Sequence, residues 1–215
     1  MTRTAGPPAA PRADGRDAIR RVARVITDVV AAAARDARRE RLVVLDAGTP
    51  EAGLLVRCLT EGGIGLPVER IRSAVGGPAS IDGLRARARA AAGVDGLLLD
   101  PVNKTVAVLW PETVAEPVLP LADLYASQVA ALADGWSAPA DAFDLIARAG
   151  GIGPVDAFLM EHLDRRRPVE EALRLIPDPD AGAELRDRLA AGWWWRRRLG
   201  LVPKLGGRTL GLDLR

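Results

Sequence analysis

The sequence predicts an α/β fold, in which a doubly wound parallel sheet is followed by a helical C-terminal part. Two short, continuously apolar runs, residues 42–45 and 96–99, are typical of strands that are buried on both faces. Segments with helical periodicity lie between these runs, and the alternation of strand and helix favours a parallel sheet with helices on both faces. The chain has 215 residues, 48% of them hydrophobic, which is enough for one domain with a sizeable core.

The first half of the chain supplies the sheet and the helices around it. Residues 1–14 are rich in Pro and Ala and are expected to be a disordered tail, which leaves residues 15–215 as the domain. From residue 17 to residue 40 the apolar side chains recur at three- and four-residue steps, the pattern of an amphipathic helix. Further elements are expected as a helix at residues 51–60, a strand at 67–71 and a helix at 81–92.

After Pro120 the pattern becomes helical. Helices are expected at residues 121–133, 140–149, 155–164, 169–175 and 181–198. The turn Ile176-Pro-Asp-Pro-Asp180 separates the last two, and residues 209–214 are expected to be a final strand or an extended tail. No internal repeat is visible.

Composition narrows the class of protein. The net charge is +2, so a pI of about 9.2 is a weak indication of a nucleic-acid partner, and none is expected. The single Cys58 and the single His162 exclude an intramolecular disulfide, a cysteine-rich zinc site and a histidine-based metal cluster. No apolar run approaches 18 residues and the first 13 residues lack the apolar core of a secretory signal, so a cytoplasmic protein without a membrane span is expected.

Two stretches that follow the 96–99 run carry a resemblance to a known family. The first contains Asn103-Lys104-Thr105 and the second is Leu119-Pro-Leu-Ala-Asp-Leu-Tyr-Ala-Ser-Gln-Val129. They resemble the Asn-Lys-Ser-Glu motif and the Pro-Ile-Gly-Asp-Leu-Tyr helix start of NAD synthases, over roughly residues 20–215. The resemblance implies a Rossmann-like fold of the adenine nucleotide alpha-hydrolase type and a homodimer. It also implies an activity in which ATP adenylates nicotinic acid adenine dinucleotide and ammonia then displaces AMP, with ATP and magnesium at the end of the first strand.

The pyrophosphate loop of that family is altered in this chain. Where the family has Ser-Gly-Gly-x-Asp-Ser, residues 46–51 read Asp-Ala-Gly-Thr-Pro-Glu, so that Gly48 is retained and Thr49 still offers a hydroxyl. Asp46 would bring a negative charge toward a bound phosphate, and two like charges about 4 Å apart repel by roughly 4 kcal/mol at an effective dielectric near 20. The structural interpretation is a strand-to-helix turn with acidic caps, because acidic side chains suit a helix N-terminus without any ligand.

The resemblance implies a set of nucleotide-binding residues: Gly48, Thr49, Arg85, Asn103, Lys104 and Thr105. Val106 replaces the acidic residue of the Asn-Lys-Ser-Glu motif, which removes a magnesium ligand. Lys104 is one of only two lysines, and it is expected either to contact a phosphate as a point charge or to be a solvated lysine at the end of a loop. Asp123 and Tyr125 are expected to act in capping and packing.

Two functions follow from these residues. In the first, the protein is a catalytically degenerate NAD-synthase-like subunit, with no catalytic residue of its own, that senses an adenine nucleotide or dinucleotide and associates as a homodimer or with a related protein. In the second, it is an active, ammonia-using, ATP-dependent amide ligase with a rebuilt site. Asp46, Glu51 and Glu116 would then form a magnesium shell, since oxygen ligands must converge on the ion, and Lys104 would meet the phosphates.

Three further features invite a functional interpretation. Trp193, Trp194 and Trp195 point in three directions on a helix, so at least one is expected to meet a partner chain or a lid, and the competing hypothesis is stacking on single-stranded nucleic acid. Cys58 lies in an apolar helical run and is expected to be a small core residue. The glycines of residues 150–153 follow a helix and not a strand, so they predict a helix end and a turn.

Overall fold

The structure is a computed structural model that describes residues 15–72, 81–114, 118–133, 135–192 and 202–203. The predicted tail at residues 1–14, the expected element at 209–214 and the three adjacent tryptophans lie outside the described residues.

The sheet has three parallel strands, β1 (Arg41–Asp46), β2 (Val68–Arg72) and β3 (Gly96–Leu99), in the order β2-β1-β3. In the central strand, Leu42 is paired with Val68 on one side and with Leu97 on the other. The three predicted strands and their parallel arrangement are therefore confirmed.

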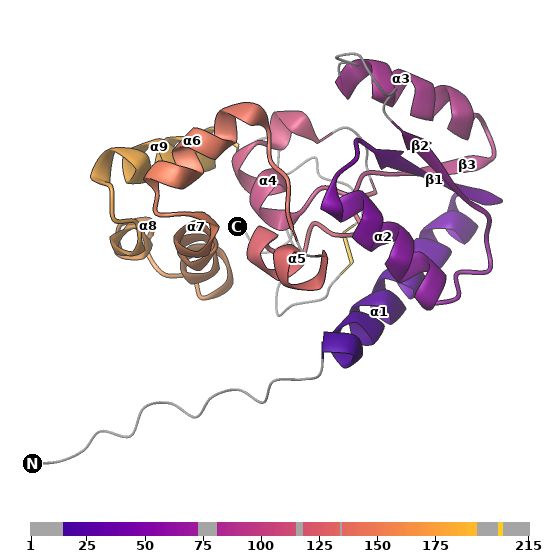
Figure 1. Cartoon of the computed structure of the whole chain (residues 1–215), viewed down its shortest axis with the longest axis horizontal. Helices are drawn as coiled ribbons and strands as arrows, with labels where there is room; N and C mark the ends of the chain where they lie inside the picture. Colours follow the sequence, from indigo (N-terminus) through magenta and orange to yellow (C-terminus); the bar gives the residue numbers. More distant parts are fainter. Residues whose placement is uncertain (1–14, 73–80, 115–117, 134, 193–201, 204–215) are drawn as a thin grey trace, which may run out of the picture.

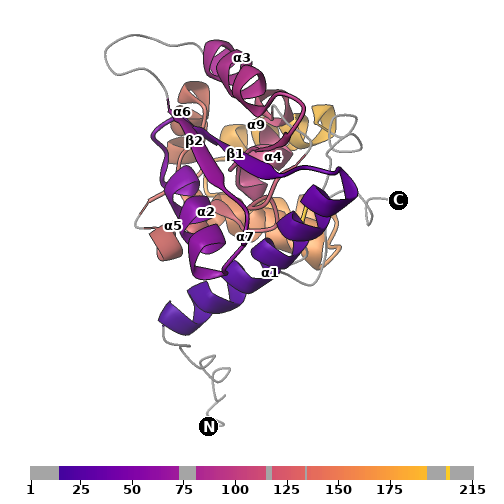
Figure 2. The ribbon, with the colours of Figure 1, turned by 90° about the vertical axis from the view of Figure 1, so that its right-hand side faces the viewer.

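Helices lie on both faces of this sheet. The helices α1 (Gly15–Asp36) and α2 (Pro50–Glu61) lie side by side on one face, and α3 (Ile81–Ala92) lies on the other (Figures 1 and 2). The three helices confirm the amphipathic segments that were predicted, within a few residues at each end.

The side chains of β1 alternate between these two layers, as the pleat of a strand requires. Leu42 and Val44 belong to the core formed with α1 and α2, whereas Val43 and Leu45 belong to a smaller core with α3. All four are at most 4% exposed, which explains why β1 has no polar residue between Arg41 and Asp46.

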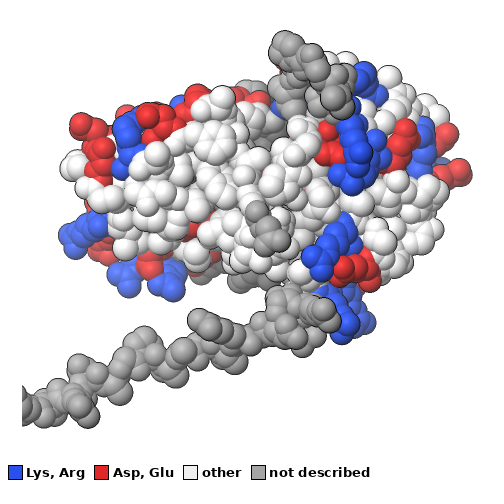
Figure 3. All heavy atoms as spheres, viewed as in Figure 1, with Lys and Arg blue, Asp and Glu red and all other residues white. Residues whose placement is uncertain are grey.

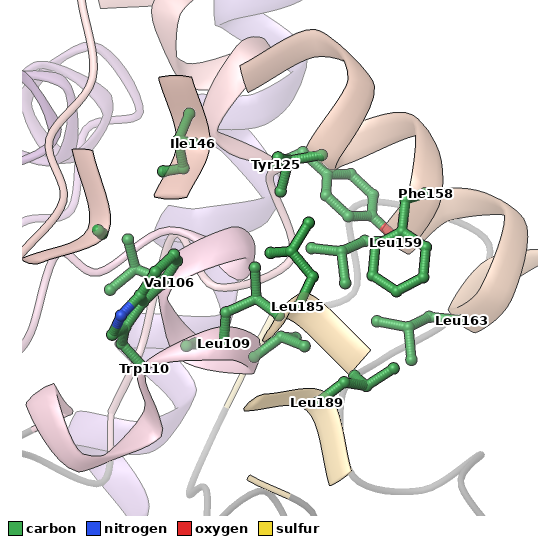
Figure 4. Packing of buried hydrophobic residues seen from close by; sticks show 14 of the residues in the cluster. Val106, Leu109, Trp110, Tyr125, Ile146, Phe158, Leu159, Leu163, Leu185 and Leu189 are labelled. Atoms are coloured by element: carbon green, nitrogen blue, oxygen red, sulfur yellow. The ribbon is translucent and has the colours of Figure 1, made fainter. Parts of the chain in front are cut away.

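The helical part contains α4 (Lys104–Leu109), η1 (Pro111–Thr113), α5 (Ala126–Ala133), α6 (Ala140–Arg148), α7 (Ile152–Leu159), the π-helical turn η2 (Met160–Asp164), α8 (Val169–Ala172), η3 (Leu173–Leu175) and α9 (Pro179–Ala191). Its core gathers around Trp110 and Phe158, both fully buried (Figure 4). Leu109, Leu159 and Leu185 pack in the same cluster and join α4, α7 and α9. The helical part thus has a hydrophobic core of its own, and the segment after β3 connects it to the sheet.

Two sequence predictions in this part were wrong. The helix expected at residues 121–133 begins only at Ala126, because the backbone before it makes other hydrogen bonds: Leu124 O accepts from Lys104 N at 2.8 Å, and Leu124 N donates to Leu121 O. The short helix α4 was not expected, since the segment after β3 was interpreted as a loop. The last helix follows its prediction as far as Ala191, where its described part ends.

Charged side chains of both signs lie interspersed around the rim of the face shown in Figure 3, and the middle of that face, over α5, α6 and α7, shows few of them. Many are paired, as Arg148 is with Glu184 and Arg188 with Asp141. Within the described part of the chain, no helix is both long enough and apolar enough to cross a bilayer.

Candidate functional site

A cavity of about 540 Å³ opens at the carboxyl ends of β1 and β3. Its walls come from the end of β1 and the loop after it, the start of α3, the loop after β3 with α4 and η1, and the segment before α6. The lining residues include Ala47 and Thr49, Leu84 and Arg85, Asp100 to Val102, Thr113, and Ser137 to Pro139. The volume lies within the range of about 300–1,000 Å³ that is usual for small-molecule sites.

The position of this cavity follows from the strand order. The chain leaves β1 through α2 toward β2 on one side, and it reaches β3 on the other side through α3. The carboxyl ends of β1 and β3 therefore mark the point where the connections diverge, and open α/β sheets bind ligands in the crevice at such a point. The cavity therefore lies where open α/β sheets generally bind their ligands.

The loop after β1 is a tight strand-to-helix turn. Gly48 has a φ of +80°, in the left-handed region that favours glycine. The Thr49 hydroxyl caps α2 by accepting from Ala52 N at 3.3 Å, and Pro50 occupies the first turn, where its missing N–H is no loss. The cap is therefore Thr49 and not one of the acidic residues that were expected to cap this turn.

Asp46, at the end of β1, is held by the neighbouring strand. Its carboxylate lies 2.6 Å from Arg70 Nη2 and 3.3 Å from Arg72 Nε, and it also accepts from Gly48 N at 3.0 Å. The residue is only 2% exposed, so its charge is neutralised locally by these arginines of β2.

Glu51 joins three segments of the cavity wall. Its Oε1 accepts from Asn103 Nδ2 at 2.9 Å and from Ser137 N at 2.8 Å, and its Oε2 accepts from Ser137 Oγ at 2.7 Å. Asn103 in turn caps α4, since its Oδ1 accepts from Val106 N at 3.0 Å. Because Glu51 is 2% exposed, its carboxylate serves to fix the segment around Ser137 against α2.

Arg85 extends from α3 along the cavity wall. Its Nη1 donates to Asp82 Oδ1 at 3.1 Å, and its Nη2 donates to the carbonyl oxygen of Thr113. Its side chain is 14% exposed, and Arg85 is the cation that the described residues contribute to this cavity.

Lys104 is buried in the helical part. Its Nζ lies 2.8 Å from Asp164 Oδ1 and 3.9 Å from Asp123 Oδ1, and 4.4 Å from the centre of the Tyr125 ring. Tyr125 donates its hydroxyl to Asp164 Oδ2 at 3.0 Å. Burial, and then the Asp164 carboxylate, raise the pKa of Tyr125 well above its ordinary value, so the phenol stays protonated and donates. The expectation of a solvated lysine at a loop end is wrong, because Lys104 is 3% exposed and begins α4.

Asp123 belongs to the same cluster: it precedes the start of α5 by three residues and lies close to Lys104. Tyr125 packs in the core of the helical part, as was expected.

Thr105 belongs to a separate buried network. Its hydroxyl donates to Asp156 Oδ1 at 2.5 Å and accepts from Ala126 N at 3.0 Å, while Asp156 Oδ2 accepts from Ser127 N at 2.7 Å. Burial raises the pKa of Asp156, and the hydrogen bonds from Ser127 and Thr105 oppose that effect. This network satisfies the first N–H groups of α5 and ties that helix to α4 and α7.

The structure thus divides the residues singled out in the sequence. Thr49 and Arg85 line the cavity, and Gly48 lies in the adjoining turn. Asn103 does not line the cavity, but it donates a hydrogen bond to Glu51, which holds the segment around Ser137. Lys104 and Thr105 instead donate hydrogen bonds to Asp164 and Asp156 within the helical part. Cys58 is fully buried, and Gly150 and Gly151 form the turn between α6 and α7, both as expected.

Several residues of the site were not found in the sequence. Asp100 directly follows β3 at the carboxyl edge of the sheet, a position that could have identified it. No local signal points to Ser137 or Asp164, because each meets its partner only through the tertiary fold. Among the described residues no group of three or more His, Cys, Asp or Glu side chains is arranged to hold a metal ion, and Glu116 lies outside those residues.

Comparison of the chain with protein-family models, with curated proteins and with solved structures gives no match. Its functional interpretation therefore rests on the α/β fold, on the geometry of the cavity and on the motifs of the sequence.

Proposed function

We propose that this protein is a non-catalytic, NAD-synthase-like protein that binds an adenine nucleotide or dinucleotide at the carboxyl ends of β1 and β3. The observation that carries the proposal is the cavity itself. It lies at the switch point of the sheet, and Thr49 and Arg85, two residues that the motif resemblance assigns to the nucleotide, form part of its wall. A nucleotide-sensing role follows, in which the bound ligand would contact the loop after β1, α3 and the segment before α6 at once.

The contacts of the acidic residues support a non-catalytic role. In the ligase alternative, Asp46 and Glu51 would hold magnesium and Lys104 would hold phosphate. Asp46 is instead paired with Arg70, Glu51 with Asn103 and Ser137, and Lys104 with Asp164. Each of these groups would have to break a buried ion pair or hydrogen bond before it could bind a ligand, and breaking such a pair is costly.

Isothermal titration calorimetry with AMP, ATP and nicotinic acid adenine dinucleotide, with and without magnesium, tests this proposal. Binding of at least one of these ligands without a requirement for magnesium is expected, together with no ATP-dependent amidation of the dinucleotide. Amidation by the purified protein would overturn the non-catalytic role and favour the ligase alternative. If none of the three ligands binds, the proposal as a whole fails.

A pair of variants tests the location of the site. Ala47 lines the cavity and is exposed in the loop after β1, so Ala47→Trp is expected to block binding without disturbing the core. Ala131 is exposed on α5, and Ala131→Trp provides the matched control that should leave binding unchanged. Equal affinities of the two variants would place the nucleotide elsewhere.

A further inference from the structure

We infer that the cavity selects an adenine ligand with a single phosphate and discriminates against the triphosphate; this inference rests on the proposed function. The charged groups that the described residues contribute to its wall are one guanidinium, that of Arg85, and the carboxylates of Asp82, Asp100 and Glu112. A wall of this composition offers one contact to an anion and disfavours further negative charge.

Arg85 is suited to bind one phosphate group. Within the described residues it uses one donor on Asp82 and one on the Thr113 carbonyl oxygen, and a guanidinium carries five N–H donors. The partner Asp82 has a side chain that is 81% exposed, so this ion pair is weak and a ligand phosphate can compete for the guanidinium. Charge-assisted hydrogen bonds from arginine to phosphate oxygens are strong and frequently bidentate.

An acidic side chain at the rim acts against a second and a third phosphate. Glu112 stands at the exposed rim of the cavity in η1. Its carboxylate can accept hydrogen bonds from ribose hydroxyls or from an adenine amino group, but it repels phosphate oxygens.

The other basic residues near this edge of the fold are already engaged. Lys104 Nζ lies 2.8 Å from Asp164 and is directed into the helical part, and Arg70 Nη2 lies 2.6 Å from Asp46. The additional charges of a triphosphate would therefore meet carboxylates at the cavity wall without a second described cation among the residues that line it.

Titrations of adenosine, AMP and ATP in magnesium-free buffer test this selectivity. AMP is expected to bind more tightly than adenosine, through Arg85, and at least about tenfold more tightly than ATP. In Arg85→Gln the affinity for AMP should fall by about tenfold to a hundredfold, the loss expected for a hydrogen bond to a charged group, while the affinity for adenosine stays the same. Arg57→Gln is the matched control, because Arg57 forms an exposed pair with Glu61 on α2 outside the cavity.

A second variant tests the carboxylates separately. Glu112→Gln removes one negative charge from the exposed rim and is expected to strengthen ATP binding by about two- to fivefold, with little effect on adenosine. If ATP binds as tightly as AMP, or if Arg85→Gln leaves the ratio of AMP to adenosine affinity unchanged, the selectivity is refuted while the proposed function stands. If adenosine, AMP and ATP fail to bind but nicotinic acid adenine dinucleotide binds, only the selectivity is refuted, and if all four fail to bind, both are refuted.

Discussion

Replacement of Lys104 by methionine tests whether this lysine stabilises the fold or serves to bind a ligand. The Lys104 ammonium lies 2.8 Å from Asp164 and 3.9 Å from Asp123, and the side chains of Lys104 and Asp123 are 4% and 0% exposed. Methionine keeps most of the side-chain volume but removes the cation from the two carboxylates. Removal of one partner from a buried ion pair costs about 3–5 kcal/mol, and because the nearer carboxylate, Asp164, is 32% exposed and partly screened by water, the free energy of unfolding of Lys104→Met should fall by about 3 kcal/mol, the lower end of that range.

Urea denaturation followed by circular dichroism measures this loss, with an unchanged m-value as the sign that the unfolded state is the same. The melting temperature should fall by about 6–12 °C, since each kcal/mol is worth about 2–4 °C in a domain of this size. The control Arg57→Met breaks an exposed pair and should cost less than about 1 kcal/mol. Adding Asp164→Asn to Lys104→Met should recover part of the loss, because one orphaned charge is then removed. A loss below about 1 kcal/mol in Lys104→Met would refute the structural role.

Three further predictions concern the buried groups of the fold. Burial raises the pKa of the Cys58 thiol to about 12, so a thiol reagent at neutral pH should label it only after unfolding in guanidinium, and rapid labelling of the native protein would contradict its burial. A Cβ on Gly62 would clash with Thr27 Oγ1 on α1, so Gly62→Ala should lower the free energy of unfolding by about 1–3 kcal/mol. In α2, a Cβ on Gly53 meets nothing within 4 Å, so Gly53→Ala should raise the free energy of unfolding by about 0.5–1 kcal/mol. Urea denaturation compares the two variants, and equal effects would contradict the close packing of α1 on α2. Because the pKa of Asp156 is raised in the native state, its protonated form favours folding at low pH, and this contribution is lost as the pH rises through the native pKa. The stability of the wild type relative to Asp156→Asn should therefore decrease as the pH rises above the ordinary pKa of an aspartate, about 3.9, and a difference that does not change with pH would contradict the raised pKa.

The elements of the α/β half could be predicted because their signals are local. The apolar run of β1 and the helical periodicity of α1 to α3 depend on residues a few positions apart, and burial on both faces of a strand leaves the run continuously apolar. The tight turn at Gly48 and Thr49 also follows from short-range chemistry. The residues of the loop after β1 could be identified in the sequence, but the partners of Asp46 could not, because Arg70 and Arg72 reach it only when β2 pairs with β1.

The start of α5 shows why other elements escaped prediction. The apolar pattern after Pro120 is compatible with a helix from residue 121, yet Leu124 O accepts a hydrogen bond from Lys104 N and not from a residue of that helix. The same contact helps to order α4, whose six residues are too few to form a helix in isolation. Local periodicity reports which side chains are apolar, and it does not report which backbone groups a distant segment will occupy.

The sequence by itself determined the parallel α/β half, the burial of Cys58 and the tight turn at Gly48 after β1. Only the tertiary structure decided what the charged residues do. Glu51 meets Ser137 across 86 positions of sequence, and Lys104 meets Asp164 across 60. A carboxylate or an ammonium carries the same charge in a ligand site and in an internal ion pair, and the difference lies in which opposite charge the fold brings within a few ångströms and removes from water.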